Sequence, residues 1–338
     1  MSWVVWRQHR NQAYFAAVAL AAFAVLMLVT GLQMASQYHS ALTLCAASHS
    51  CDNLANTLSL ESPAVSVLVT LTVAVPCLLG VFWGGPLVAR EFETGTSQFA
   101  WMQGVSRTRW LTITLGWVLI AAAAWGGAVS GLVTWWSSPV NSLMQQNFQP
   151  SQFDIQGIVP IGYAVFAVAL GIAAGALLRR ALPAMAITLV VFTVLRLVVS
   201  EDFRSTYLTP ITKTFSFVEP GRTFMPTGSY WLVSSGLVGP SGPVRGGLLG
   251  NGPTLSVDGV RIPVAALPSA CRTLLFEAPS KTVGGFPSCM AAHGYRAVIS
   301  YQPADRYWAF QGIETGIFVV LAAALIAITA IAVLRRDA

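Results

Sequence analysis

Charged residues are scarce in this sequence: Asp, Glu, Lys and Arg make up 9% of its 338 residues, and hydrophobic residues make up 55%. This balance excludes an ordinary soluble protein of this length. A bilayer-spanning helix needs roughly 20 mostly apolar residues, and six stretches come close to that requirement. They cover residues 13–34, 64–87, 111–136, 157–178, 181–199 and 315–334. We therefore predict an all-α membrane protein with six transmembrane helices.

Catalytic and metal-binding motifs are also missing. The sequence has no G-x-x-x-x-G-K-[ST] loop for nucleotide phosphates, no H-E-x-x-H or C-x-x-C pair for a metal, and no G-x-S-x-G nucleophile elbow. Its four histidines are scattered at positions 9, 39, 49 and 293. We therefore expect neither an enzyme nor a metal site, and no cofactor bound by this chain.

The predicted spans contain no Asp, Glu, Lys or His, and Arg196 is their single charged residue. Ion-coupled transporters normally place ionisable groups at membrane depth. Uphill transport by this chain would therefore need energy from another subunit. Arg196 lies near one end of its span, where its long side chain can reach the lipid headgroups. A contact with a substrate or a partner is the alternative.

The placement of arginine predicts the orientation in the membrane. Nine arginines lie in short segments on one side: Arg7, Arg10, Arg90, Arg107, Arg109, Arg179, Arg180, Arg335 and Arg336. The loops on the other side, 35–63 and 137–156, contain no Arg or Lys. The positive-inside rule then puts both termini in the cytoplasm. This asymmetry accounts for the net charge of +6 without nucleic acid, and the Arg-, Ala- and Gly-rich composition favours a bacterial plasma membrane.

Four of the five cysteines fall on the predicted outer side, which is oxidising and allows disulfides to persist. We favour the pairs Cys45–Cys51 and Cys271–Cys289 over the other pairings because each pair lies within one segment. Cys77 falls inside the second span, where we expect it to be a small buried apolar residue.

Residues 200–309 are rich in glycine and proline and form the largest segment outside the predicted spans. The runs TLSV and VRIPV flank Asp258-Gly259, a dipeptide favoured in hairpin turns, and YRAVISY at 295–301 alternates as a strand. We expect a small, irregular α+β extracellular domain here. The membrane domain would cover 1–199, and the last helix with a cytoplasmic tail would cover 310–338.

A connector, REFETGTSQFAWMQGVSRTRW at 90–110, follows the second span on the cytoplasmic side. Glu91 and Glu93 put two acids beside the inner membrane surface. Gly95 then permits a sharp turn, and Thr96 can cap a new helix. The sequence therefore predicts a short helix between the second and third spans.

This short helix would carry apolar side chains on more than one side. On a helical wheel, Phe99 and Met102 share one side, whereas Gln98 and Trp101 share another. Such a helix suits a position between two protein surfaces, and Arg107 marks the return to the membrane border. Insertion of the aromatic side chains into the headgroup layer is the alternative.

The connector and a second segment resemble a known family. The connector reads E-x-E-x-G-T-x-x-x-x-W-x-x-G-x-S-R-x-R-W, and YQPADRYWAFQGIETGIF at 301–318 leads into the last span. With six spans and a large outer segment before the sixth, these features resemble the permease subunits of type-2 ABC transporters, the drug and antibiotic exporters. The second segment is similar to that of many actinobacterial members.

The resemblance implies a dimer of permease chains, identical or different, joined by two cytoplasmic ABC ATPase subunits that bind ATP and Mg²⁺. Residues implied to couple to the ATPase are Glu91, Glu93, Gly95, Thr96, Phe99, Trp101, Met102 and Arg107. Spans two and five usually line the cavity in this class, which gives the candidates Pro76, Phe82, Trp83, Phe192 and Arg196. The apolar character of these spans implies an apolar or amphipathic, drug-like substrate that moves outward.

Two other functions are compatible with six spans. One is a non-transporting sensor or assembly module whose extracellular domain binds a ligand or a protein. The other is an ATP-independent channel or carrier. Copurification with an ATPase distinguishes the exporter subunit from both.

Overall fold

The computed structural model describes residues 2–48, 63–93, 106–144, 148, 150–216, 230–240, 242–244, 254–257, 260–263, 267–272 and 285–335. The chain divides into two compact units. The membrane unit combines Met1–Tyr207 with Trp308–Ala338, and the sheet unit covers Leu208–Tyr307. The membrane unit is helical, whereas the described strands all lie in the sheet unit.

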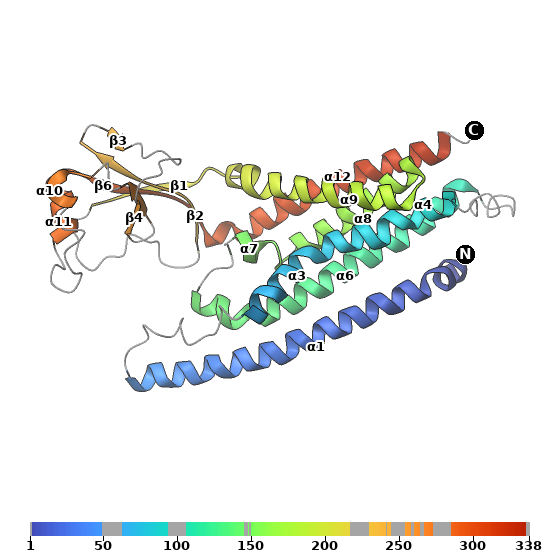
Figure 1. The fold of residues 1–338 in the computed structure, drawn as a ribbon, viewed down its shortest axis with the longest axis horizontal. Coiled ribbons are helices and arrows are strands. Elements are labelled where there is room, and N and C mark those ends of the chain that lie inside the picture. Colours follow the sequence, from blue (N-terminus) through green and yellow to red (C-terminus); the bar gives the residue numbers. More distant parts are fainter. Residues whose placement is uncertain are drawn as a thin grey trace. The chain divides into compact units, whose positions relative to one another are not determined.

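Six described helices of the membrane unit are long and apolar enough to cross a membrane, which confirms the predicted number of spans. They cover Ala17–Ser40, Val67–Glu93, Leu111–Ser138, Val159–Leu178, Ala181–Thr206 and Ala304–Leu334. The complete helices are α1 (Ser2–Ser48), α3 (Pro63–Leu79), α4 (Gly85–Glu93), α6 (Arg107–Met144), α7 (Pro150–Phe153), α8 (Val159–Leu178), α9 (Ala181–Val198) and α12 (Tyr307–Arg335), drawn in Figure 1.

The fifth and sixth spans extend furthest beyond their predicted bounds, and both additions carry charge. The fifth continues beyond α9 through a π-helical turn, η2 (Val199–Phe203), and a 3₁₀ turn, η3 (Arg204–Thr206), instead of ending at 199. The sixth span begins with a 3₁₀ turn at Ala304, and its helix α12 begins at Tyr307 rather than at 315. The predicted spans stopped just before Glu201 and just after Glu314, whereas Arg204 and Glu314 form a buried ion pair that allows charges within these helices.

Helix α8 packs against α3, α4, α6 and α9. Most of its residues are buried, as expected for a helix that is apolar on every side. Its small-residue face allows close approach, since a methyl group at Gly171 would overlap the carbonyl oxygen of Gly80. A methyl group at Gly175 would lie 2.7 Å from the carbonyl oxygen of Gly85. The Gly171–Gly175 pair thus allows the close helix packing that small residues permit in membranes.

The second span is irregular between α3 and α4. Pro76 lies inside α3 and is buried, and its ring removes one backbone donor from the helix. A π-helical turn, η1 (Gly80–Gly84), follows it. This turn packs on α8, and such turns are often found at functional sites.

The sheet unit contains a four-stranded antiparallel sheet in the order β1-β6-β2-β3 and a separate hairpin, β4-β5. The strands are β1 (Ile211–Ser216), β2 (Tyr230–Gly239), β3 (Gly242–Val244), β4 (Thr254–Val257), β5 (Val260–Pro263) and β6 (Arg296–Pro303). The predicted strand at 295–301 is β6, which pairs with both β1 and β2. The predicted hairpin is also present, because Val257 pairs with Val260; its turn residues, Asp258 and Gly259, lie outside the described residues.

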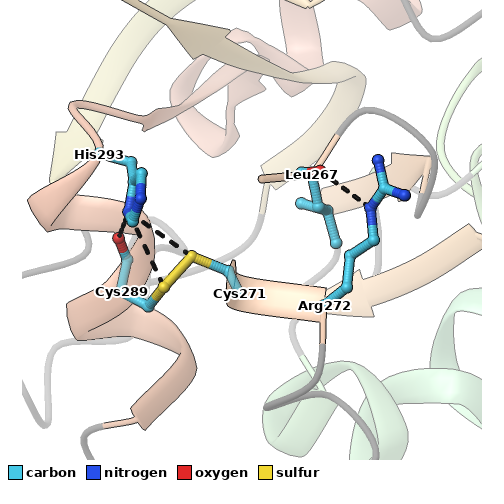
Figure 2. Close-up of a disulfide and its surroundings, with 5 residues drawn as sticks. All are labelled: Leu267, Cys271, Arg272, Cys289 and His293. Atoms are coloured by element: carbon cyan, nitrogen blue, oxygen red, sulfur yellow. Dashed lines mark hydrogen bonds between the residues drawn. A yellow bond between two sulfur atoms is a disulfide. The ribbon is translucent and has the colours of Figure 1, made fainter. Parts of the chain in front are cut away.

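The sheet unit has its own buried core and a disulfide. The core residues are Leu237, Leu267, Cys271, Met290, Ala297, Ile299 and Tyr301. Figure 2 shows the bond between Cys271 of α10 (Ser269–Arg272) and Cys289 of α11 (Gly285–Ala292), whose Cα atoms are 5.8 Å apart. This disulfide was predicted from the sequence. For the second predicted pair, Cys51 and the side chain of Cys45 lie outside the described residues, whereas Cys77 is a buried free cysteine as expected.

Candidate functional site

Most of the predicted coupling residues lie outside the described part of the chain: Gly95, Thr96, Phe99, Trp101 and Met102. For Arg107 the structure describes the backbone, which begins α6. Glu91 and Glu93 lie in the last turn of α4. The structure therefore shows where the connector leaves and re-enters the helices, and the role of its central residues stays a prediction.

Glu93 joins the start of the connector to the turn between α8 and α9. Its Oε1 accepts a hydrogen bond of 2.8 Å from the backbone N–H of Ala181, the first residue of α9. A carboxylate in this position satisfies an unpaired N–H and interacts favourably with the helix dipole. Beside this contact, the Arg179 guanidinium lies 5.2 Å from the centroid of the Phe92 ring. The Arg-rich turn and the end of α4 thus form one surface.

The five candidate cavity residues do not lie together. Phe82 and Trp83 line a cavity of about 600 Å³ formed by apolar side chains of α1, the second span and α6. Phe192 and Arg196 line a different cavity of about 560 Å³ between α3 and α9. Pro76 is buried and lines neither of these two cavities. Leu78 belongs to both linings, so the two cavities lie on adjacent faces of α3.

A buried ionic cluster occupies one end of the membrane unit, and it consists of Asp154, Arg196, Arg204 and Glu314. Arg196 donates to Asp154 Oδ2 at 2.9 Å and to the carbonyl oxygen of Val73 at 2.7 Å. Arg204 donates to the other Asp154 oxygen, and it reaches the two Glu314 oxygens at 2.7 and 2.9 Å. Arg204 is 1% exposed and Glu314 is 0% exposed. The cluster joins the extension of α9 to α12 and to the segment after α7.

Aromatic side chains surround these charges. Tyr163 of α8 donates a hydrogen bond to Glu314, and the Arg196 guanidinium lies 5.0 Å from the centre of the Tyr163 ring. The Arg204 guanidinium lies 4.5 Å from the Phe153 ring. Tyr207 donates to Glu314 Oε2 at 3.4 Å. Burial raises the pKa of Tyr207, and the negative charge of Glu314 raises it further, so this phenol remains a neutral donor.

Gln311 of α12 makes hydrogen bonds to the segment between α7 and α8. Its side-chain oxygen accepts hydrogen bonds of 2.9 Å from the backbone N–H groups of Ile158 and Val159, where α8 begins. Its side-chain nitrogen donates to the Phe153 carbonyl oxygen at 3.1 Å. Gln311 therefore caps α8 from a different helix. Together with Glu314, one turn further along α12, it fixes the segment between α7 and α8.

The positions and contacts of these residues correct two predictions made from the sequence. The spans do contain an acid, because Glu314 lies within Ala304–Leu334. The expectation that Arg196 reaches the headgroups is also wrong, because this residue is 9% exposed and ion-paired. Two arginines balance two carboxylates, so the buried group has no net charge. Leaving any one of them unpaired would be costly.

The spacing of polar residues in the sequence indicates this cluster, although a search for uncharged runs does not detect it. Gln311, Glu314 and Phe318 follow one another at intervals of three and four residues on an otherwise apolar helix. That spacing puts them on one face, and a polar group on a membrane helix normally faces the protein interior. All three are fully buried. Arg204 had no comparable signal, since it follows the apolar run.

In the sheet unit, Cys271, Cys289 and His293 bring three potential metal ligands within 4.8 Å of one another. His293 Nδ1 lies 3.8 Å from each sulfur and 2.8 Å from the carbonyl oxygen of Cys289 (Figure 2). The two sulfurs are bonded to each other, whereas metal binding needs the thiolates. In this oxidised form the group is a disulfide beside an imidazole.

Comparison with protein families gives a match for the first part of the chain. Residues 17–204 match the model of a family described as ABC-2 membrane transporter related. No curated protein and no solved structure matches the chain. The family match covers more than half of the sequence and includes the first four spans, most of the fifth, the connector and the basic residues of the ionic cluster. The chain belongs to the ABC-2 membrane transporter related family.

Proposed function

We propose that this chain is the membrane-spanning permease subunit of an ATP-driven exporter, located in a bacterial plasma membrane. The family match over residues 17–204 carries this proposal. The sequence supports it, because a chain without a phosphate-binding loop needs a partner to hydrolyse ATP. The partner is a cytoplasmic ABC ATPase, which binds ATP and Mg²⁺, in two copies per complex. A second permease chain, identical or different, completes the assembly.

The connector is the proposed docking site for the ATPase. It leaves the membrane unit after Glu93 and returns at Arg107, next to the Arg-rich turn that Glu93 contacts. By the positive-inside rule this side is cytoplasmic, as are both termini. The sheet unit, with its disulfide, then lies outside. Motion of the ATPase would be transmitted to α9 through α4, because the Glu93–Ala181 contact joins the two helices.

The proposed substrate is apolar or amphipathic, in the manner of a lipophilic drug. The cavity of about 600 Å³ supports this class because its lining is formed by Ala, Leu, Val, Phe and Trp side chains. It is large enough for a drug-sized ligand. Phe82 and Trp83 would contact the apolar body of the substrate.

The test is copurification of the full-length chain with a cytoplasmic ATPase from the same membranes. We expect the isolated complex to hydrolyse Mg-ATP, and we expect Trp101→Ala to reduce both the bound ATPase and the hydrolysis. Trp308→Ala provides the matched control, because Trp308 is exposed on α12 outside the connector. An isolated chain that assembles normally but brings down no ATPase would refute the proposal and favour a sensor or assembly module.

A further inference from the structure

The cavity between α3 and α9 differs from the apolar one because part of its lining is charged. Its apolar lining includes Leu78, Leu189 and Phe192. Its charged and polar lining residues are Asp154, Arg196, Ser200 and Glu201, and Val73 lies beside them because its carbonyl oxygen accepts a hydrogen bond from Arg196. An apolar lining with fixed charges is complementary to an amphiphile.

Arg196 can bind an additional anionic or acceptor group. Among the described residues, its guanidinium makes two hydrogen bonds, to Asp154 and to the Val73 carbonyl oxygen. A guanidinium has five N–H donors, so three remain for a ligand. If the ligand also drew Arg196 away from Asp154, that carboxylate would keep Arg204 as a partner. An anionic group bound here would therefore leave no carboxylate unpaired.

Glu201 supplies the opposite charge. It lies in η2, one and a half turns beyond Arg196, and it lines the same cavity. Its side chain is exposed and has no ion-pair partner within the described ranges. An ammonium group bound beside Glu201 would gain a partner that the protein itself does not provide.

We propose that this cavity binds the dipolar head of an amphiphile, with an anionic group on Arg196 and an ammonium group beside Glu201. The ligand class rests on the proposed function as a transport subunit. A dipolar head adds no net charge to the cavity, whereas an anion alone would repel Glu201 and a cation alone would repel Arg196. The apolar chain of the ligand lies along α3 and α9.

The experiment measures protection of a thiol placed in the cavity. The full-length Ser200→Cys variant, purified in maltoside micelles, is labelled with N-ethylmaleimide, and the labelled peptide is quantified by mass spectrometry. Three probes share one chain: hexylphosphocholine, hexyl phosphate and hexyltrimethylammonium. We expect hexylphosphocholine to protect at a concentration about tenfold lower than hexyltrimethylammonium, the difference of one charge-assisted hydrogen bond. The exposed Thr206→Cys variant is the control, since Thr206 does not line the cavity.

Two further variants assign the charges. In the Ser200→Cys background, Glu201→Gln should remove the advantage of hexylphosphocholine over hexyl phosphate. Protection by hexyl phosphate itself should become stronger, because the repelling carboxylate is gone. Arg196→Lys should weaken protection by both phosphate-bearing probes and leave hexyltrimethylammonium unaffected. Glu201 is exposed, so its variant keeps the test valid even where an Arg196 variant misfolds. Equal protection by all three probes, or unchanged selectivity in Glu201→Gln, would overturn the proposal.

The same label identifies the source of the ligand. Labelling is repeated without any added probe in vesicles of phosphatidylcholine and in vesicles of phosphatidylglycerol. Slower labelling in phosphatidylcholine would support a bilayer lipid as the dipolar ligand. Equal labelling in the two vesicles, with protection by added hexylphosphocholine, would support a free amphiphile. ATPase copurification in the Ser200→Cys background separates the hypotheses: headgroup selectivity can fail while the ATPase still binds, which refutes the ligand class alone.

Discussion

Arg204 and Glu314 form a buried ion pair between the extension of the fifth span and the sixth span, with nitrogen–oxygen distances of 2.7 and 2.9 Å. The pair closes the membrane unit at one end, because Asp154 then connects Arg204 to Arg196. Neither residue is adjacent in sequence to the other. Their contact makes the position of α12 depend on that of α9.

Replacing Glu314 with Gln removes the charge that balances Arg204 in the interior. We expect this change to lower the free energy of unfolding by roughly 3–5 kcal/mol, because it leaves an arginine buried without its main partner. Denaturant titration of the purified protein measures the change. Glu201→Gln is the control, since an exposed side chain of this kind should change stability by less than about 0.5 kcal/mol. Equal stability of the two variants would show that the pair contributes nothing.

Close packing of α8 makes a second prediction. Gly171→Ala would push a methyl group into the backbone of the second span at Gly80 and Gly85. Overpacking of this kind costs about 1–3 kcal/mol. Gly131→Ala is the matched control, because a methyl group at this position on α6 would meet no atom within 4 Å. We expect it to be neutral or stabilising by up to about 1 kcal/mol. Thermal unfolding of both variants measures the difference, and similar losses would refute this packing argument.

The sequence predicts the helices better than it predicts the contacts between them. Apolar runs identify the six spans because bilayer thickness sets their length. The same criterion made the predicted sixth span begin at 315, directly after Glu314. It did so although YQPADRYWAFQGIETGIF was recognised as a distinctive segment. Glu314 is compatible with a membrane helix because Arg204 and Tyr163 satisfy its carboxylate. Those partners come from distant parts of the chain, so local composition does not reveal them.

The candidate cavity residues show a similar limit. Phe82 and Phe192 were grouped because both lie in spans that usually line the passage in this class. In the structure, Phe82 is 62% exposed, whereas Phe192 is 1% exposed and contacts Tyr163 and Phe166. The direction in which a side chain points depends on the rotation of its helix about its own axis. Helices that are apolar all round, as α8 is, give little information about that rotation.

The cap formed by Glu93 gives a third prediction. Glu93→Ala leaves the N–H of Ala181 without this acceptor, and we expect a loss of about 1 kcal/mol in stability. Glu93→Gln keeps an oxygen acceptor and loses only the favourable interaction with the helix dipole, about 0.3–1 kcal/mol. Denaturant titration should therefore rank Gln between Glu and Ala. If Gln is as stable as Glu while ATP hydrolysis by the complex falls, Glu93 acts on the ATPase rather than on α9.

The disulfide gives a prediction that is confined to the sheet unit. Replacing Cys271 and Cys289 together with Ser removes a link between residues 18 positions apart, and such links typically contribute 2–4 kcal/mol, so we expect about that loss here. The membrane unit has separate buried cores, around α8 and α6. Limited proteolysis should therefore cut the double variant faster within 208–307, while the spans remain protected in micelles. Equal cleavage of the variant and the parent protein would show that the core around Met290 and Ile299 holds the unit together without the bond.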